Sequence, residues 1–95
     1  MKEEKKLVLN LQKVSIETEI DKFEQKDLSK VCGNMVFQMA GDIGLEETAR
    51  ELYHKGKVEL TESMMKMYRG IVEHSGRPLY VIRAITTEID KTLKP

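Results

Sequence analysis

The sequence LSKVCGNMVFQMA, residues 28–40, spaces its apolar side chains three and four residues apart. That spacing lines up side chains on one face of an α-helix, so this segment is predicted to be a helix packed against a core. Asp27 is expected to cap its first turn and Gly41 to end it. Gly33, inside the helix, costs about 1 kcal/mol relative to alanine. We therefore expect another backbone to approach closely at this glycine.

Residues 7–20, ahead of this helix, alternate between apolar and polar side chains, which is the pattern of a β-strand. The apolar positions are odd-numbered up to Leu11 and even-numbered from Val14. Because a slip of one residue turns side chains to the opposite face, either two strands meet near Gln12 or one strand carries a bulge there. No glycine or other tight-turn signal occurs at that point, which favours the bulge. Phe23, just after the strand, is expected to anchor the core.

The second half of the chain predicts helices separated by short connections. Residues 45–55 carry an apolar stripe that Gly56 ends, and residues 57–60 alternate like a short strand or an extended connection. Thr61 is expected to cap the next helix. The core-facing residues of that helix are predicted to be Met64, Tyr68, Ile71 and Val72, with Met65 at the edge. Residues 79–93 contain many β-branched side chains, yet their long apolar stripe favours a helix over a strand.

These elements predict an α+β fold. Its N-terminal β element, either a bulged strand or a hairpin, is followed by three or four short helices packed on it and on one another. A chain of 95 residues can form one modest core. We therefore expect a single small domain at residues 7–95, with residues 1–6 as a flexible N-terminus.

The charges of the chain balance, with 16 basic and 16 acidic side chains and a formal net charge of zero. Such a chain has no overall field to hold a polyanion, so nucleic acid is the less favoured partner. Low net charge also favours self-association. Residues 41–64 hold six acidic and three basic side chains and residues 65–95 the reverse, so opposed patches could steer a contact between copies. The single cysteine and the lack of a long apolar run predict a cytoplasmic protein without a membrane segment.

Cys32, His54 and His74 are the residues best suited to nucleophilic or metal chemistry, and each has a structural explanation. Cys32 lies in the apolar stripe, where a thiol acts as a small hydrophobic side chain. The histidines lie near predicted helix ends, where an imidazolium complements the helix dipole. The same dipole stabilises the carboxylates at the start of the second helix, which are Asp42, Glu46, Glu47 and Glu51. We therefore predict no catalytic residue, no cofactor and no metal.

Two further patterns suggest ligands but lack essential parts. The segment Gly41–Gly44 lacks the third glycine and the Lys-Ser/Thr pair of known phosphate loops. Residues 35–40 and 45–55, joined by that segment, have the lengths of a helix-turn-helix. The second helix would, however, present mainly glutamates to DNA, which opposes the dominant electrostatic attraction.

Because the sequence indicates no catalytic or metal site, the expected function is a non-enzymatic protein-interaction or assembly role, through self-association or a protein partner. If a helix face stays exposed, the contact residues are predicted to be Tyr53, Met64, Met65, Met67, Tyr68 and Tyr80, although the core is their default location. The alternative is a small nucleic-acid-binding regulator. Its predicted contacts come from the basic last third of the chain and are Arg69, Arg77, Arg83, Lys91 and Lys94.

Three stretches also resemble small proteins encoded by phages and integrated prophages, namely Val14–Glu17, Asp27–Lys30 and Leu45–Glu62. The likeness is a pattern of one strand followed by short capped helices, over about half of the chain. It implies an assembly, adaptor or host-takeover role and carries over no functional residue.

Overall fold

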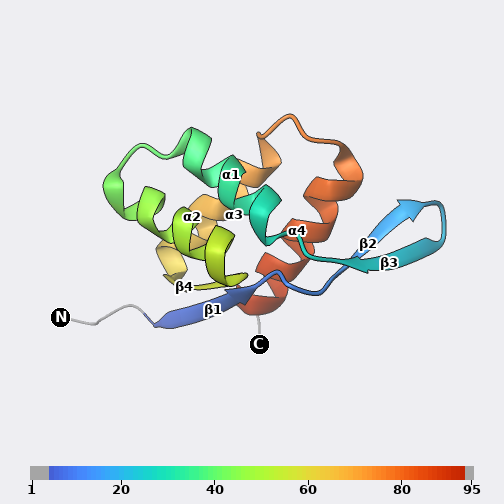
Figure 1. Cartoon of the computed structure of the whole chain (residues 1–95), viewed down its shortest axis with the longest axis horizontal. Helices are drawn as coiled ribbons and strands as arrows, with labels where there is room; N and C mark the ends of the chain where they lie inside the picture. The colour runs from blue at the N-terminus through green and yellow to red at the C-terminus, as the bar shows by residue number, and fades with distance from the viewer. Residues whose placement is uncertain (1–4, 94–95) are drawn as a thin grey trace.

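The computed structural model describes residues 5–93, whose elements are labelled in Figure 1. Along the chain they are β1 (Lys6–Asn10), β2 (Val14–Glu19), β3 (Lys22–Lys26), α1 (Ser29–Met39), α2 (Ile43–Lys55), β4 (Lys57–Thr61), α3 (Glu62–Glu73) and α4 (Leu79–Leu93). The expected α+β fold is confirmed. Of the segment 1–6 that was expected to be flexible, residues 1–4 lie outside the described residues, and Lys6 is the first residue of β1.

The strands form two separate antiparallel sheets, β1 with β4 and β2 with β3. The expectation of a single bulged strand is therefore wrong. Leu11 lies where the chain crosses between the sheets, because its N–H donates to the Gly56 carbonyl (3.0 Å) and its carbonyl accepts from the Leu28 N–H (2.9 Å). On either side of this crossing, odd-numbered Leu9 and even-numbered Val14 are both fully buried. The change of parity thus marks a change of sheet.

The strands β2 and β3 form a hairpin that projects from the helical body (Figure 1). Its turn holds Asp21 at φ 62°, a left-handed conformation that aspartate tolerates better than most residues. Val14 and Ile16 of β2 are buried, whereas every residue of β3 is exposed. The expectation that Phe23 anchors the core is wrong, since its side chain is 65 % exposed. Phe23 pairs with Glu17, on the opposite face of the hairpin from Ile16.

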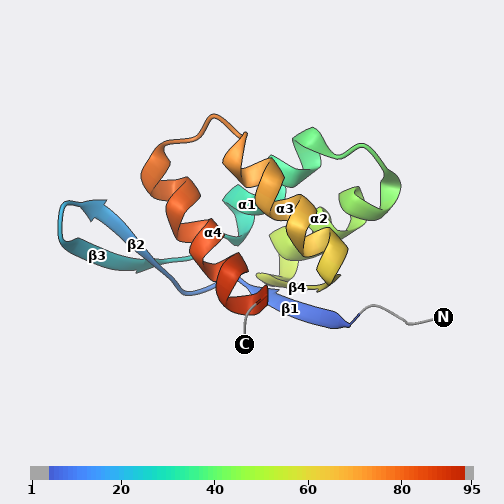
Figure 2. The same ribbon diagram turned by 180° about the vertical axis from the view of Figure 1, so that it is seen from behind.

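The four helices form two layers, with α1 and α2 nearer the viewer in Figure 1 and α3 and α4 nearer the viewer in Figure 2. The segment 79–93 is a helix, as expected, and it packs against α3, β1 and β2. No helix within residues 5–93 has the length and apolarity to cross a bilayer. The core between the layers contains Leu9, Leu11, Val14, Ile16, Cys32, Met35, Val36, Leu45, Leu52, Val58, Leu60, Met65, Tyr68, Val72, Ile85 and Ile89.

The apolar stripe of residues 28–40 packs into this core as α1, except that Met39 at its end is 59 % exposed. Gly33 lies where α1 meets α2. A Cβ at this position would be 2.9 Å from the Ala49 carbonyl oxygen and 3.1 Å from the Tyr53 Cβ. The expected close approach of another backbone is confirmed, and it explains a glycine in a helix interior.

The third helix turns a slightly different face inward than expected. Met65, Tyr68 and Val72 are fully buried, whereas Met64 and Ile71 are only partly covered. Met65, predicted at the edge of the stripe, is therefore at its centre. The reason is that α3 packs against α1, α4 and both strands of the β1–β4 sheet, rather than against one neighbour.

Side-chain caps and one glycine fix the limits of α2 and α3. Asp42 Oδ1 accepts the Leu45 N–H at 2.8 Å where α2 begins, and Gly56 ends α2 in a left-handed conformation (φ 79°). Thr61 Oγ1 accepts the Met64 N–H at 3.2 Å where α3 begins. The expected roles of Gly56 and Thr61 are confirmed.

The limits of α1 differ from expectation at both ends. Leu28 occupies the N-cap position, although Asp27 Oδ1 still accepts the Ser29 hydroxyl at 2.5 Å and the Ser29 N–H at 2.9 Å. These two bonds, the hydroxyl bond most strongly, lower the pKa of Asp27. Ala40, in an extended conformation, ends the helix, so Gly41 is not a left-handed stop.

Candidate protein-interaction surface

The six predicted contact residues do not form one surface. Two of them, Met65 and Tyr68, are fully buried, so the expectation that they contact a partner is corrected: both belong to the core. The others are exposed or partly exposed and are spread over the three helices α2, α3 and α4: they are Tyr53, Met64, Met67 and Tyr80. These residues therefore do not by themselves define an interaction surface.

A groove of about 250 Å³ lies between the hairpin and α4. We call it the hairpin groove, and it is lined by Ser15, Glu17, Phe23, Tyr80, Arg83, Ala84, Thr87, Glu88 and Lys91. One wall is the face of α4 on which residues recur three or four positions apart, from Tyr80 to Lys91. The other wall is the hairpin face that carries Glu17 and Phe23, which pair across β2 and β3.

Two aromatic side chains line the hairpin groove from opposite walls. Phe23 of β3 is 65 % exposed and Tyr80 of α4 is 45 % exposed. Aromatic side chains bury a large area at a low cost in conformational entropy, and they contribute strongly to binding when a partner covers them. Because both line the same groove, this part of the surface differs from isolated exposed apolar residues, which are common.

Most charged side chains of the hairpin groove already have partners. The Glu17 carboxylate accepts the Asp21 N–H at 2.9 Å, and Lys91 Nζ lies 3.5 Å from Glu88 Oε1. Arg83, by contrast, forms no ion pair with any residue that the structure describes. Its guanidinium is an always-charged group with several donors, suited to a carboxylate. The groove thus combines apolar area with one available cation.

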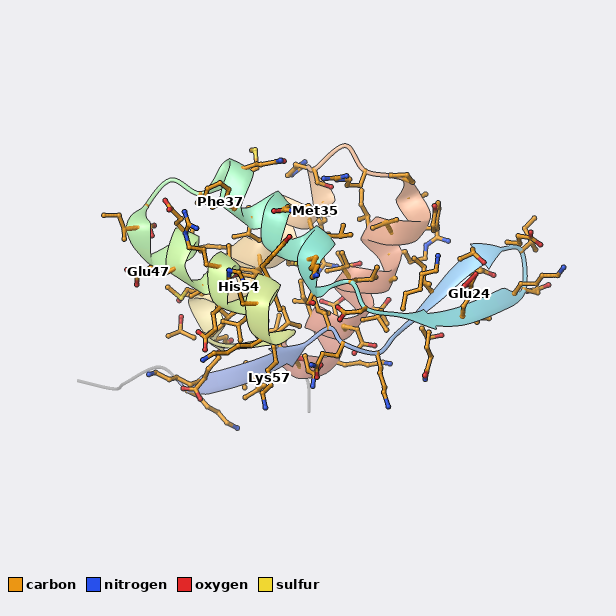
Figure 3. The ribbon with its side chains drawn as sticks, in the orientation of Figure 1. Glu24, Met35, Phe37, Glu47, His54 and Lys57 are labelled. Atoms are coloured by element: carbon orange, nitrogen blue, oxygen red, sulfur yellow. The ribbon has the colours of Figure 1, made fainter. Side chains whose placement is uncertain are left out.

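A second groove, of about 160 Å³, runs between α1 and α2. The Arg50 guanidinium lies 5.0 Å from the centre of the Phe37 ring, and Lys30 Nζ lies 5.5 Å from the centre of the Tyr53 ring. Figure 3 labels Phe37 on α1 and His54 on α2, the two helices that form its walls. Because cation–π contacts already occupy these aromatic faces, this groove is a weaker candidate.

A third hollow, wide and shallow, lies between the α1–α2 connection and α3 and has a volume of about 510 Å³. Its apolar lining includes Met39, Leu45, Met67 and Ile71. Its carboxylate, on Asp42, is already bonded to the Leu45 N–H. The hollow therefore offers mainly apolar contact, without the aromatic side chains of the hairpin groove.

The three residues considered for catalytic or metal chemistry are not assembled into a site. Cys32 is fully buried in the core, and burial raises the pKa of its thiol to about 12. His54 lies in the last turn of α2 and His74 is the C-cap residue of α3, so both are at helix ends as expected. Within residues 5–93, no three or more His, Cys, Asp or Glu side chains are placed to hold a metal ion.

The four described basic residues of the nucleic-acid alternative do not form a free patch. Arg69 Nε lies 2.8 Å from Asp90 Oδ1, and the same guanidinium also pairs with Glu73. The bond to Asp90 raises the pKa of Arg69. Arg83 and Lys91 share the hairpin groove with two glutamates. The other two residues are Arg77, exposed in the connection before α4, and Lys94, which lies outside the described residues.

The helix-turn-helix and phosphate-loop patterns correspond to α1, α2 and their connection. The exposed face of α2 carries its own ion pairs, Glu46 with Arg50 at 3.1 Å and Glu51 with Lys55 at 3.3 Å. The N-terminus of α2, where a phosphate would bind, is occupied by the Asp42 carboxylate. Both observations favour structural roles for these charges.

No protein-family model, curated protein or solved structure matches this chain. The candidate site therefore rests on its geometry. Sequence reasoning singled out Tyr80, Arg83 and Lys91 but divided them between two functions, and it placed Phe23 in the core. The signal that identifies Phe23 is the stretch Lys22–Lys26, KFEQK, in which one aromatic residue stands among polar neighbours as on an exposed strand.

Proposed function

We propose that this chain is a non-enzymatic protein-interaction module whose hairpin groove receives a segment of a partner protein. The observation that carries the proposal is the exposure of Phe23 and Tyr80, from two separate elements, on the walls of one groove. Exposed aromatic residues that converge on a concave surface are typical of protein-binding sites.

The hairpin itself supports this proposal. A two-stranded hairpin is marginally stable alone, and β3 buries no side chain in the body of the protein. The hairpin is held by β2, through the buried Val14 and Ile16 and the packing of β2 on α4. β3 therefore adds little to the core, and its clearest contribution is to hold Phe23 across the groove from α4.

The chemistry of the groove defines the partner segment. An apolar side chain of the partner would lie between Phe23 and Tyr80, and an aspartate or glutamate beside it would pair with Arg83. The volume of about 250 Å³ is below the range of about 300–1,000 Å³ that is usual for small-molecule sites. It suits one or two side chains of a protein segment better than a free cofactor.

A displayed library of random peptides, selected on the immobilised full chain, tests this proposal. We expect selected peptides to share an apolar residue next to an acidic one. Phe23→Ser and Tyr80→Ser should each weaken binding of a selected peptide at least about tenfold, which corresponds to about 1.4 kcal/mol. Arg83→Gln should remove the preference for the acidic residue. Met39→Ser, an exposed change in a different hollow, is the matched control and should leave binding unchanged.

Two results would count against the protein-interaction proposal. One is a library that yields no binder, or binders whose affinity is unaffected by both aromatic substitutions. The other is binding of duplex DNA that weakens steeply with salt and is lost when Arg83 and Lys91 are both changed to glutamine. That second outcome would support the nucleic-acid alternative instead.

A further inference from the structure

The strand β1 has an open edge, and the backbone groups that face it can be assigned. β1 pairs antiparallel with β4, and the ladder continues to the bond from the Leu11 N–H to the Gly56 carbonyl. Because alternate residues of an antiparallel strand exchange hydrogen bonds with the neighbour, the odd-numbered residues of β1 direct their N–H and C=O groups to β4. Those of Lys6, Val8 and Asn10 therefore point away from β4. Figures 1 and 2 show β1 along the rim of the molecule, and β4 is the only strand that pairs with it within residues 5–93.

We propose that this edge pairs with the same edge of a second copy of the chain. The two β1 strands would run antiparallel about a two-fold axis at Val8. In that register Val8 opposes Val8 of the second copy, and Lys6 opposes Asn10, so every outward-facing backbone group of one strand meets an outward-facing group of the other. The two small sheets would join into one sheet with the strand order β4-β1-β1-β4. This inference goes beyond the proposed function, because it uses a surface distant from the hairpin groove.

The side chains of β1 fit this register. Val8, which is 53 % exposed, gains an apolar partner directly opposite, a favourable cross-strand pair. On the other face of the strand, the partly buried Leu7 comes opposite Leu9 of the second copy and extends the apolar layer. No like charges oppose each other, since Lys6 faces the neutral Asn10. Lys6 also keeps its contact with Glu59, at 3.8 Å across the existing sheet.

The strand β3, whose only strand partner within residues 5–93 is β2, does not fit a second copy in the same way. Pairing of β3 with itself over its full length would centre on Glu24 and set this residue opposite its own counterpart. It would also set Lys22 opposite Lys26. Like charges directly opposite are destabilising, and charged residues on an edge strand are a known protection against unwanted pairing. Self-pairing therefore favours β1 over β3, and the zero net charge of the chain adds no overall repulsion between copies.

Sedimentation of the full chain tests the pairing. The contact is short, so we expect a weak dimer with a dissociation constant between about 10 μM and 1 mM. Val8→Lys places two like charges on the two-fold axis and should leave a monomer at all measured concentrations. Phe23→Lys is the matched control, because Phe23 is also an exposed apolar residue, on β3 (65 % against 53 % for Val8), and this variant should still dimerise. Val8→Lys leaves the hairpin groove intact, and Phe23→Lys leaves the β1 edge intact. Failure of the β1 dimer can therefore be distinguished from failure of partner binding in the hairpin groove.

Cross-linking tests the register and does not depend on Val8→Lys remaining folded. Val8→Cys should form a disulfide-linked dimer under a mild thiol oxidant, because facing residues in such a pair have Cα atoms about 5.5 Å apart. Lys6→Cys should not, because its counterpart would lie about 13 Å along the strand. A mixture of the Lys6→Cys and Asn10→Cys proteins should cross-link. A wild-type chain that stays monomeric up to about 1 mM, a dimer that survives Val8→Lys, or equal cross-linking of Val8→Cys and Lys6→Cys would overturn the proposal.

Discussion

Gly33 in α1 and Ala49 in α2 lie so close that a Cβ on Gly33 would be 2.9 Å from the Ala49 carbonyl oxygen. Contacts this short essentially do not occur with backbone atoms, which cannot rotate away as a side chain can. The two helices therefore pack at backbone distance at this point, and glycine is the residue that allows it. The same contact brings Tyr53 of α2 beside α1, where Lys30 covers its ring.

Substitution of Gly33 by alanine compares the steric cost of this contact with the gain in helix propensity. Alanine at position 33 should gain about 1 kcal/mol of propensity but lose about 1–3 kcal/mol to overpacking, so we expect a net loss of stability. Gly70 in α3 is the matched control, because a Cβ there would meet nothing within 4 Å. Gly70→Ala should therefore stabilise the protein. Chemical denaturation of the two variants measures both effects, and an equal gain from both would show that α1 and α2 do not touch at Gly33.

The left-handed glycines at positions 56 and 76 allow a second comparison. Both have positive φ values, 79° and 75°, so alanine at either site should cost about 1–2 kcal/mol. A Cβ at Gly56 would also lie 2.4 Å from Gln12 Cγ, whereas one at Gly76 would lie in open space. Gly56→Ala should therefore lower the melting temperature more than Gly76→Ala.

The side chain of Gln12 explains this expected difference, because it donates to the Lys55 carbonyl at 3.2 Å and would have to leave. In a Gln12→Ala background the two glycine substitutions should become nearly equal. A difference that persists in that background would mean that the crowding has another source.

The Tyr68 hydroxyl joins α3 to α2 through a bond to Thr48 Oγ1 at 2.6 Å, and the Thr48 hydroxyl in turn donates to the Leu45 carbonyl at 2.8 Å. Tyr68→Phe should lower the free energy of unfolding by about 0.5–1.5 kcal/mol, the usual contribution of such a bond. Tyr80→Phe, at an exposed site, should change it by less than about 0.5 kcal/mol. Urea titrations of the two variants give the comparison, and equal losses would contradict the role of the Thr48 bond.

The buried thiol of Cys32 predicts a loss of stability at alkaline pH. Burial raises its pKa in the folded protein to about 12 from an ordinary value of 9.0. Between these two values the unfolded chain has lost the proton that the folded chain keeps, so stability should fall with rising pH. The slope is at most about 1.4 kcal/mol per pH unit for one group. Cys32→Ala should give a shallower fall between pH 9 and pH 10.

Tyr68 reinforces this alkaline effect at higher pH, because burial also raises the pKa of its hydroxyl. The Cys32 thiol should meanwhile be unreactive toward a thiol reagent at pH 8 until the protein is unfolded by denaturant. Rapid labelling of the native protein would contradict the buried position of Cys32.

Local sequence features predicted much of the secondary structure. The stripe in residues 28–40, the Thr61 cap, the Gly56 stop and the helix at 79–93 follow from side-chain spacing and from capping chemistry within a few residues. These features act between near neighbours in the chain. The close approach at Gly33 was predicted for the same reason, since a glycine that lowers helix propensity points to a contact that requires it.

The pairing of strands was decided by the tertiary structure. The sequence shows a change of parity between Leu11 and Val14, but it does not show that β1 pairs with β4, more than forty residues away. Because β1 pairs with β4, β1 and β2 lie in different sheets. Where a bulge was predicted, the chain instead crosses from one sheet to the other. Strand pairing depends on distant segments, whose positions follow from how the whole core packs.

The candidate site depends on the same long-range packing. Phe23 is apolar, and the sequence alone places it in the core. In the fold, Val14 and Ile16 fill the space beneath the hairpin, and the opposite face, with Phe23, is left beside α4 and Tyr80. The sequence by itself determined which segments form the helices, because helical spacing and caps depend on local geometry, but it did not indicate β3. The tertiary structure decided which apolar side chains remain outside, because burial depends on which distant surfaces meet.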